Sequence, residues 1–215
     1  MRKLSFKQIN KYSYLASYNF SKIEKNFVKI NSKRNKLLTI NQFSKILKDK
    51  KFKKYFLSGG SLLGLIRDNN FIPGDDDIDF ACASEDLSGC ITKLQKKFIK
   101  NNFIARTKNA REFVKLNLYK NGNKISLQSY KKKKQWRITG TFKLPGKDFE
   151  KIKKKTFLNI KVNIPKNAEN YLEHVYGMWK IKNSSNFFYT LKYYKHDTFY
   201  SVYRKLSRIL RVKTD

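Results

Sequence analysis

With 215 residues, of which 40% are apolar and 15% aromatic, the chain is large enough for one domain with its own core, which excludes a disordered polybasic tail. Its 49 Lys and Arg residues against 16 Asp and Glu residues give a formal charge of +33, which predicts an anionic partner such as nucleic acid, a nucleotide phosphate, an anionic glycan or a lipid headgroup. An AT-rich coding sequence would also produce many lysines, so composition drift is the alternative explanation for the charge.

In the first half of the chain, helical and extended patterns alternate. Residues 38–49 predict a helix with one apolar face made of Ile40, Phe43, Ile46 and Leu47. A short strand follows at residues 55–57 and ends in a glycine turn. Residues 61–70 read as a helix, residues 71–75 as a turn, and residues 77–83 as a strand rich in β formers.

Ser84 is predicted to cap the next helix, whose apolar stripe consists of Leu87, Ile91, Leu94 and Phe98. The clearest hairpin spans residues 113–130, where two alternating runs flank Asn121-Gly122, a pair that suits a type I′ turn.

Residues 157–165 alternate as a strand with four apolar side chains on one face: Leu158, Ile160, Val162 and Ile164. A short helix between Asn167 and Gly177 follows. Residues 197–213 predict a last helix with one apolar and one basic face, which suits either docking on the domain or lying on anionic lipid.

These elements predict an α+β fold, with a mixed sheet of roughly five strands flanked by helices and with helical arms at both ends. We expect an N-terminal helical extension at residues 1–50, a central domain at residues 51–182, and a C-terminal basic amphipathic helix at residues 183–215.

The cysteine pattern and the apolar runs indicate where the protein works. Cys82 and Cys90 have no nearby His partner and form neither a disulfide framework nor a zinc site, so we expect both to be reduced. The first 30 residues lack the continuous apolar core of a signal peptide, and the longest apolar runs are too short for a membrane span. We expect a cytoplasmic protein, with the inner face of the membrane as a candidate site of peripheral contact through the C-terminal basic helix.

Four of the few acidic residues fall within five positions, at Asp75, Asp76, Asp77 and Asp79. Alternate side chains of a strand share a face, so Asp77 and Asp79 should point the same way and form half of a cage for a hard cation such as Mg²⁺ or Mn²⁺. Upstream, Gly59-Gly60-Ser61 should form a bend whose backbone N–H groups bind an anion. The alternative is an acidic surface turn, but the apolar residues around the aspartates predict that the turn packs against a core.

The run "GGSLLGLIRDNNFIPGDDDIDF", residues 59–80, resembles the signature of the LicD family, which includes fukutin and fukutin-related protein. The shared pattern is a glycine turn, Leu-Leu-Gly, an arginine, Ile-Pro, and an aspartate run that ends in Asp-hydrophobic-Asp. The segment "IPKNAENYLEHVYGMWK", residues 164–180, is similar to the closing segment of the family. The resemblance covers roughly residues 55–180.

This resemblance implies a nucleotidyltransferase-like fold, distantly akin to the palm of DNA polymerase β. It also implies transfer of a phosphorylated alcohol, phosphocholine or ribitol phosphate, from a CDP-linked alcohol donor to a hydroxyl of a glycan or lipid-linked glycan acceptor, such as lipopolysaccharide or teichoic acid. The metal ligands of the family carry over to Asp77, Asp79 and Asp75, which would also be the catalytic residues.

The glycine turn close to the nucleotide carries over to Gly59, Gly60 and Ser61, and the arginine of the family to Arg67. The Arg67 side chain could reach the donor phosphate, or it could pair with Asp68 or with an aspartate of the run.

The chain departs from the family pattern at two positions. Gly74 stands where the family usually has tryptophan, and Ser126 stands where a further aspartate is expected on a later strand. Serine is a poor metal ligand and no general base, so the metal count and the base are left open. Glu112 and Asp75 are the candidates for the base, and an inactive relative is an alternative.

Two other functions compete with this interpretation. One is a nucleotidyltransferase that acts on RNA, a nucleotide or a protein, and the other is a catalytically impaired basic binding protein. Nucleic acid is the less favoured partner, because an aspartate cluster repels phosphate unless a metal intervenes. Lys131–Lys134, just before Trp136, could grip a glycan or nucleic acid or form a solvated loop.

Overall fold

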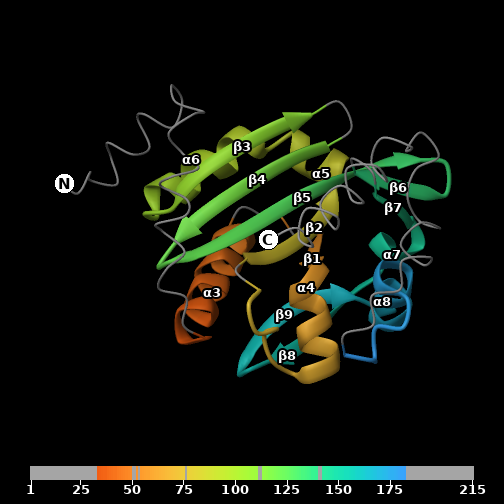
Figure 1. The fold of residues 1–215 in the computed structure, drawn as a ribbon. Coiled ribbons are helices and arrows are strands. Elements are labelled where there is room, and N and C mark those ends of the chain that lie inside the picture. The colour runs from red at the N-terminus through yellow and green to blue at the C-terminus, as the bar shows by residue number, and fades with distance from the viewer. Residues whose placement is uncertain are drawn as a thin grey trace, which may run out of the picture.

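The computed structural model describes residues 33–182, with gaps at residues 50–51, 53, 76, 111–112 and 140–141. Figure 1 shows an α+β fold in which helices flank a mixed sheet, as the sequence predicts. The helices are α3 (Lys33–Asp49), α4 (Gly59–Leu63), the π-helix η1 (Gly64–Asp68), α5 (Ser84–Ser88), α6 (Ile91–Lys100), α7 (Lys147–Glu150) and α8 (Ala168–Tyr176). The strands are β1 (Tyr55–Leu57), β2 (Asp77–Ala83), β3 (Ile104–Ala110), β4 (Phe113–Lys120), β5 (Asn123–Lys133), β6 (Trp136–Thr139), β7 (Phe142–Pro145), β8 (Ile152–Phe157) and β9 (Ile160–Pro165).

The main sheet contains seven of these strands, in the order β1-β2-β5-β4-β3, with β6 paired to the end of β5 and β7 paired to β6. Strands β2 and β5 run parallel, and the other pairs of this sheet are antiparallel. The sequence predicts roughly five strands, but the members differ: the predictions contain no strand at β3, β6 or β7, and the predicted strand at residues 157–165 lies outside this sheet as β9. The sheet is larger because the long strand β5 continues beyond this path into the β6–β7 ribbon. Strands β8 and β9 form a separate two-stranded sheet.

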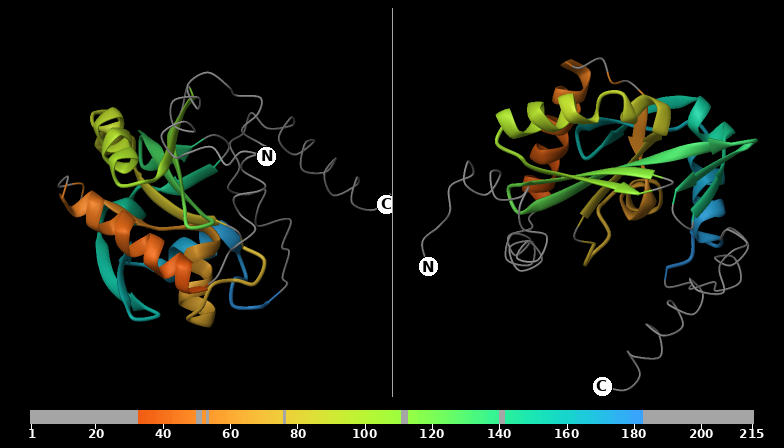
Figure 2. Two further views of the ribbon diagram at one scale, coloured as in Figure 1. Left: turned by 90° about the vertical axis from the view of Figure 1, so that its left-hand side faces the viewer. Right: turned by 90° about the horizontal axis from the view of Figure 1, so that it is seen from above.

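One face of the main sheet is apolar and is covered by α3 and α6 (Figure 2). The predicted apolar face of α3 is confirmed, because Ile40, Phe43, Ile46 and Leu47 are all buried. The ring of Phe43 lies 4.6 Å from the ring of Phe80 on β2, measured between centroids. Helix α3 therefore packs into the core of the domain, whereas the predicted boundary at residue 50 assigns it to an N-terminal extension. The positions of the domain boundaries stay predictions.

Several local predictions are confirmed. Strands β1 and β2 have the predicted bounds. At the tip of the β4–β5 hairpin, Asn121 has φ = 51° and Gly122 has φ = 73°, the two positive angles that a type I′ turn requires. Helix α8 lies between Asn167 and Gly177 as expected, and Gly177 ends it with φ = 66°.

Two local predictions are wrong. Ser84 does not cap a helix, because α5 begins at Ser84 itself and its hydroxyl donates a hydrogen bond to Ser129 Oγ at 3.0 Å. Leu158 does not lie in a strand, because Leu158 and Asn159 both have positive φ and form the turn between β8 and β9. The strand therefore begins at Ile160.

The predicted stripe of Leu87, Ile91, Leu94 and Phe98 is divided between α5 and α6, which are separate helices with Gly89 and Cys90 between them. Cys82 and Cys90 are both free thiols, as expected. The predicted basic helix at residues 197–213 lies outside the described part of the chain. Among the described residues, no helix combines the length and the apolarity that crossing a membrane requires.

Candidate active site

The alternation of strand β2 places the Asp77 and Asp79 side chains opposite the core. Ile78 and Phe80, the residues between and after them, are buried among the apolar residues of the main cluster. The two aspartates are only partly buried. Because every second side chain of a strand points the same way, both carboxylates lie on the polar face of the sheet, as the sequence predicts.

The glycine bend meets the aspartate run. Gly59 has φ = +57°, and a Cβ atom built on it would lie 2.7 Å from Asp79 Oδ2. A Cβ atom built on Gly60 would lie 2.6 Å from Asp75 Oδ2. The carboxylates of Asp79 and Asp75 thus pack directly against the bend, at a distance that only glycine allows.

Three further contacts fix this arrangement. The Asp79 backbone N–H donates to Ser61 Oγ at 3.2 Å, and the Ser58 backbone N–H donates to the Asp79 carbonyl oxygen at 2.9 Å. The Lys36 ammonium group, which comes from α3, donates to the Asp75 carbonyl oxygen. The bend and α3 are therefore held to backbone groups of the aspartate run, and these contacts do not use its carboxylates.

A group of tyrosines lies beside Asp79. The Tyr171 hydroxyl lies beside the Gly59 backbone and the Tyr130 side chain. Burial raises the pKa of Tyr130, Tyr171 and Tyr176, and the nearby charge of Asp79 raises each further, so all three phenols stay protonated. The sequence gives no signal for this group, because Tyr130 lies on β5 and Tyr171 and Tyr176 lie on α8, elements that are distant in the chain.

Negative charge accumulates at this point of the sheet. Burial, together with the neighbouring charges of Asp77 and Asp75, raises the pKa of Asp79 to about 7, although Lys115 and Lys124 oppose the increase. The Asp79 carboxylate is therefore costly to ionise in the folded chain unless a positive charge lies next to it.

Two lysines that the sequence interpretation missed face the aspartates. The Lys124 ammonium nitrogen lies 3.4 Å from Asp77 Oδ2, and Lys124 is in register with Asp77 on the parallel strand β5. Lys115 comes from β4, and burial lowers its pKa while the charge of Asp79 raises it. In the sequence, both lysines look like the polar positions of an ordinary hairpin, and only the pairing of β2 with β5 brings them to the site.

Ser126 occupies the position next to Asp79. It is in register with Asp79 on β5, is fully buried, and donates a hydrogen bond to Asn117 Oδ1 at 3.2 Å. A serine that is buried and bonded in this way adds no negative charge to the site.

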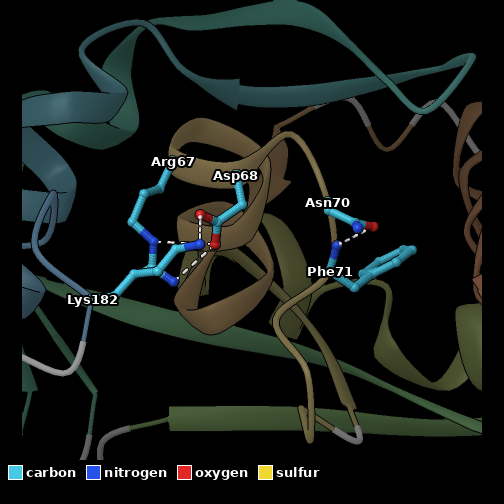
Figure 3. A network of polar contacts seen from close by, with 5 residues as sticks. All are labelled: Arg67, Asp68, Asn70, Phe71 and Lys182. Atoms are coloured by element: carbon cyan, nitrogen blue, oxygen red, sulfur yellow. Dashed lines mark hydrogen bonds and ion pairs between the residues drawn. The ribbon is translucent and has the colours of Figure 1, made fainter.

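Arg67 is engaged with its neighbour in the chain, as Figure 3 shows. Its Nε and Nη2 atoms donate to Asp68 Oδ2 at 3.1 Å and 2.9 Å, and the Lys182 ammonium nitrogen lies 3.4 Å from Asp68 Oδ1. Of the contacts expected for Arg67, the ion pair with Asp68 is the one observed. A contact with a donor phosphate stays a prediction.

The oxygen atoms of Asp75, Asp77 and Asp79 are ligands of the kind that Mg²⁺ and Mn²⁺ prefer, and a cation would offset the charge that raises the pKa of Asp79. Mg²⁺ usually takes only one or two carboxylates from a protein and completes its shell with water and phosphate, so these residues fit such an ion. Within the described residues, no group of three or more Asp, Glu, His or Cys side chains forms a ready-made metal site. Asp76 and Glu112 are not among the residues that the structure describes.

A mixed sheet flanked by helices, with paired strand carboxylates against a glycine bend, defines a protein of the nucleotidyltransferase-like α+β class. A family model described as "LicD/FKTN/FKRP, nucleotidyltransferase domain" matches residues 52–167, more than half of the chain. The chain therefore belongs to the LicD family, as its motif predicts. No curated protein matches it significantly.

Membership in this family supports a transferase with a phosphotransferase-type function on cell-surface glycans at the level of the family. The match ends at residue 167, so most of the 164–180 segment lies beyond it.

Proposed function

We propose that the protein is a Mg²⁺- or Mn²⁺-dependent phosphotransferase that moves a phosphorylated alcohol, of the phosphocholine or ribitol phosphate type, from a CDP-linked donor to a hydroxyl of a cell-surface glycan. The observation that carries this proposal is the packing of the Asp79 and Asp75 carboxylates against the Gly59-Gly60 bend in a chain of the LicD family. This contact would place a cation site and a phosphate site side by side.

Asp77 and Asp79, with Asp75 beside them, would hold the divalent cation, which supplies positive charge to the oxygens of the donor diphosphate when bound. The Gly59 backbone lies beside Tyr171, so we assign the donor phosphate oxygens to the amides of Gly60 and Ser61.

In the reaction, the acceptor hydroxyl oxygen bonds to the phosphorus atom that carries the alcohol, the bond from that phosphorus to the CMP oxygen breaks, and CMP leaves. Lys115 and Lys124 lie close enough to Asp79 and Asp77 to neutralise charge that develops on the leaving CMP. A carboxylate must accept the proton of the acceptor hydroxyl. Ser126 cannot do so, and among the described carboxylates Asp75, which lies against the bend, is our candidate.

Replacing one carboxylate tests the cation site. Asp77→Asn keeps the size of the side chain but removes a charged ligand, so transfer should fall by about a hundredfold or more. The measurement is release of CMP from CDP-choline and from CDP-ribitol in the presence of Mg²⁺ and a glycan acceptor. Glu173→Gln, at an exposed position of α8, is the matched control and should stay active. Full activity of Asp77→Asn would refute the assignment.

The runner-up function is a nucleotidyltransferase that acts on RNA, a nucleotide or a protein. Thermal shift measurements in the presence of Mg²⁺ distinguish it from the proposed phosphotransferase. CDP-linked alcohols should raise the unfolding temperature more than ATP or a short RNA does. A larger shift with ATP or RNA would favour the runner-up.

A further inference from the structure

A hollow lies away from the aspartates, where the turn between β5 and β6 faces helix α7. Its volume is about 480 Å³, within the range of sites that hold small ligands. Three lysines line it, Lys132 near the end of β5, Lys134 in the turn between β5 and β6, and Lys147 at the start of α7, and Glu150 is the acidic residue of its wall.

The charge of this hollow favours an anion. Arg137 also lines it, but its guanidinium group donates to both carboxylate oxygens of Glu85, at 2.7 Å and 2.6 Å. That pair neutralises itself, and the hydrogen bond from Arg137 holds the pKa of Glu85 below its usual value. The three lysines against one glutamate leave the lining positive.

The hollow also contains an aromatic surface. Trp136, one of only two tryptophans in the chain, lines it, and the Lys143 ammonium nitrogen lies 4.1 Å from the centroid of its ring. An indole is a flat apolar surface with one N–H donor, which complements a sugar ring that has an apolar face and hydroxyl groups.

The walls of the hollow are fixed through the backbone. The Gly146 N–H donates to the Gln135 carbonyl oxygen at 2.7 Å, and a Cβ atom on Gly146 would lie 2.9 Å from that oxygen. The β5–β6 turn and the start of α7 are thus held together without a ligand, so the hollow is preformed and little ordering is needed on binding.

The hollow is separate from the candidate active site. Strand β5 links the two, because Ser126 lies beside Asp79 and Lys132 lies six residues further along. At about 3.3 Å per residue the separation is about 20 Å. A donor nucleotide at the aspartates would not fill this hollow, whereas an extended oligosaccharide could reach both places.

We propose that the hollow around Trp136 binds an anionic oligosaccharide, as the part of the glycan acceptor that lies away from the hydroxyl to be modified. The role as acceptor site rests on the proposed function. The binding of an anionic saccharide can be measured without any transfer.

The probe is a mannose pentasaccharide that carries one phosphate group, titrated into the full chain by isothermal titration calorimetry at low salt. It should bind at least tenfold more tightly than the same pentasaccharide without phosphate. Lys132→Ala together with Lys147→Ala should weaken its binding at least tenfold. Lys93→Ala together with Lys96→Ala, which removes the same charge from the exposed side of α6, should change it less than twofold.

A second variant, Trp136→Leu, tests the aromatic surface. It should lose the change in tryptophan fluorescence that the probe causes, whereas Trp179→Phe should keep it. Thermal unfolding of each variant establishes that it is folded.

Four results would overturn the inference. The first three are no binding of the probe, equal binding of the neutral sugar, and equal losses of affinity in the two lysine pairs. The fourth is a DNA oligomer that binds more tightly than the probe and whose binding is abolished by Lys132→Ala together with Lys147→Ala. Asp77→Asn should bind the probe as the unchanged chain does. If the unchanged chain released no CMP from CDP-choline or CDP-ribitol, the proposed function would fail while the binding result stood.

Discussion

Gly59 carries two constraints at once, and they can be separated by mutation. Its φ of +57° strains any L-residue, and its missing Cβ leaves room for the Asp79 carboxylate. Gly74 has the same kind of angle, φ = +79°, but a Cβ there would meet nothing within 4 Å. The backbone strain alone costs about 1–2 kcal/mol.

We therefore predict that Gly59→Ala lowers the free energy of unfolding by more than Gly74→Ala does, and abolishes transfer because it displaces Asp79. Gly74→Ala should lose about 1 kcal/mol and keep its activity. Denaturant unfolding and the CMP-release assay measure the two effects. Equal behaviour of the two variants would show that the contact with Asp79 does not matter.

Asp148 is buried, with an exposed fraction of 2%, and neither of its carboxylate oxygens has a hydrogen-bond partner in the described part of the structure. Burial raises its pKa above 3.8, although His174 and Lys147 oppose the change. The folded chain then binds a proton more tightly than the unfolded chain, so the stability contributed by protonated Asp148 is lost as pH rises through its raised pKa.

Asp148→Asn should consequently be more stable than the unchanged chain at pH 8, by roughly 1 kcal/mol, because it removes a buried unpaired charge. The gain should disappear well below pH 3.8, where Asp148 is protonated in both states. Urea unfolding at several pH values measures it. A gain that is the same at every pH would show that charge is not its cause.

At the scale of the element, helix α3 is the clearest case of a segment that packing has made part of the core. The ring of Phe43 is fully buried and contacts Tyr55, Phe80 and Phe98 at centroid distances of 5.8, 4.6 and 5.6 Å. Helix α3 also reaches the candidate active site, because Lys36 donates to the Asp75 carbonyl oxygen.

Phe43→Ala should therefore lower the free energy of unfolding by about 3–5 kcal/mol, since it leaves a cavity between α3 and the sheet. Leu38→Ala, at a position of the same helix that is 47% exposed, should change it by less than about 0.5 kcal/mol. Chemical denaturation compares the two. A small loss for Phe43→Ala would mean that the domain folds without α3.

Within single elements, the sequence pattern identifies some turn and cap residues and misidentifies others. The Asn121-Gly122 turn is predictable because both residues tolerate positive φ, whereas Leu158 is not recognisable as a turn residue, since its apolar side chain continues the alternation of β9. Ser84 has the chemistry of a helix cap, but its hydroxyl is used by Ser129 from a strand 45 residues away. In both cases a tertiary contact or a backbone turn overrides the local preference.

At the scale of the whole molecule, a formal charge of +33 makes the folded chain repel itself. Salt screens this repulsion, because the Debye length falls to about 8 Å at physiological ionic strength. Raising NaCl from about 20 mM to about 300 mM should therefore raise the unfolding temperature by about 2–4 °C, the equivalent of roughly 1 kcal/mol. Differential scanning fluorimetry measures it, with KCl as the control salt. A fall in the unfolding temperature would show that favourable ion pairs dominate.

The amino-acid pattern alone predicts the α+β class, the apolar faces, the strand that carries Asp77 and Asp79, and the family, because these depend on local periodicity and on a contiguous motif. The groups that surround the aspartates become visible only in the folded chain. Lys124 and Lys115 reach them through the pairing of β2 with β5 and of β5 with β4, and Tyr171 reaches Gly59 from a helix more than 100 residues further along. Strand pairing and helix docking are set by burial over the whole chain, so no local pattern encodes these neighbours.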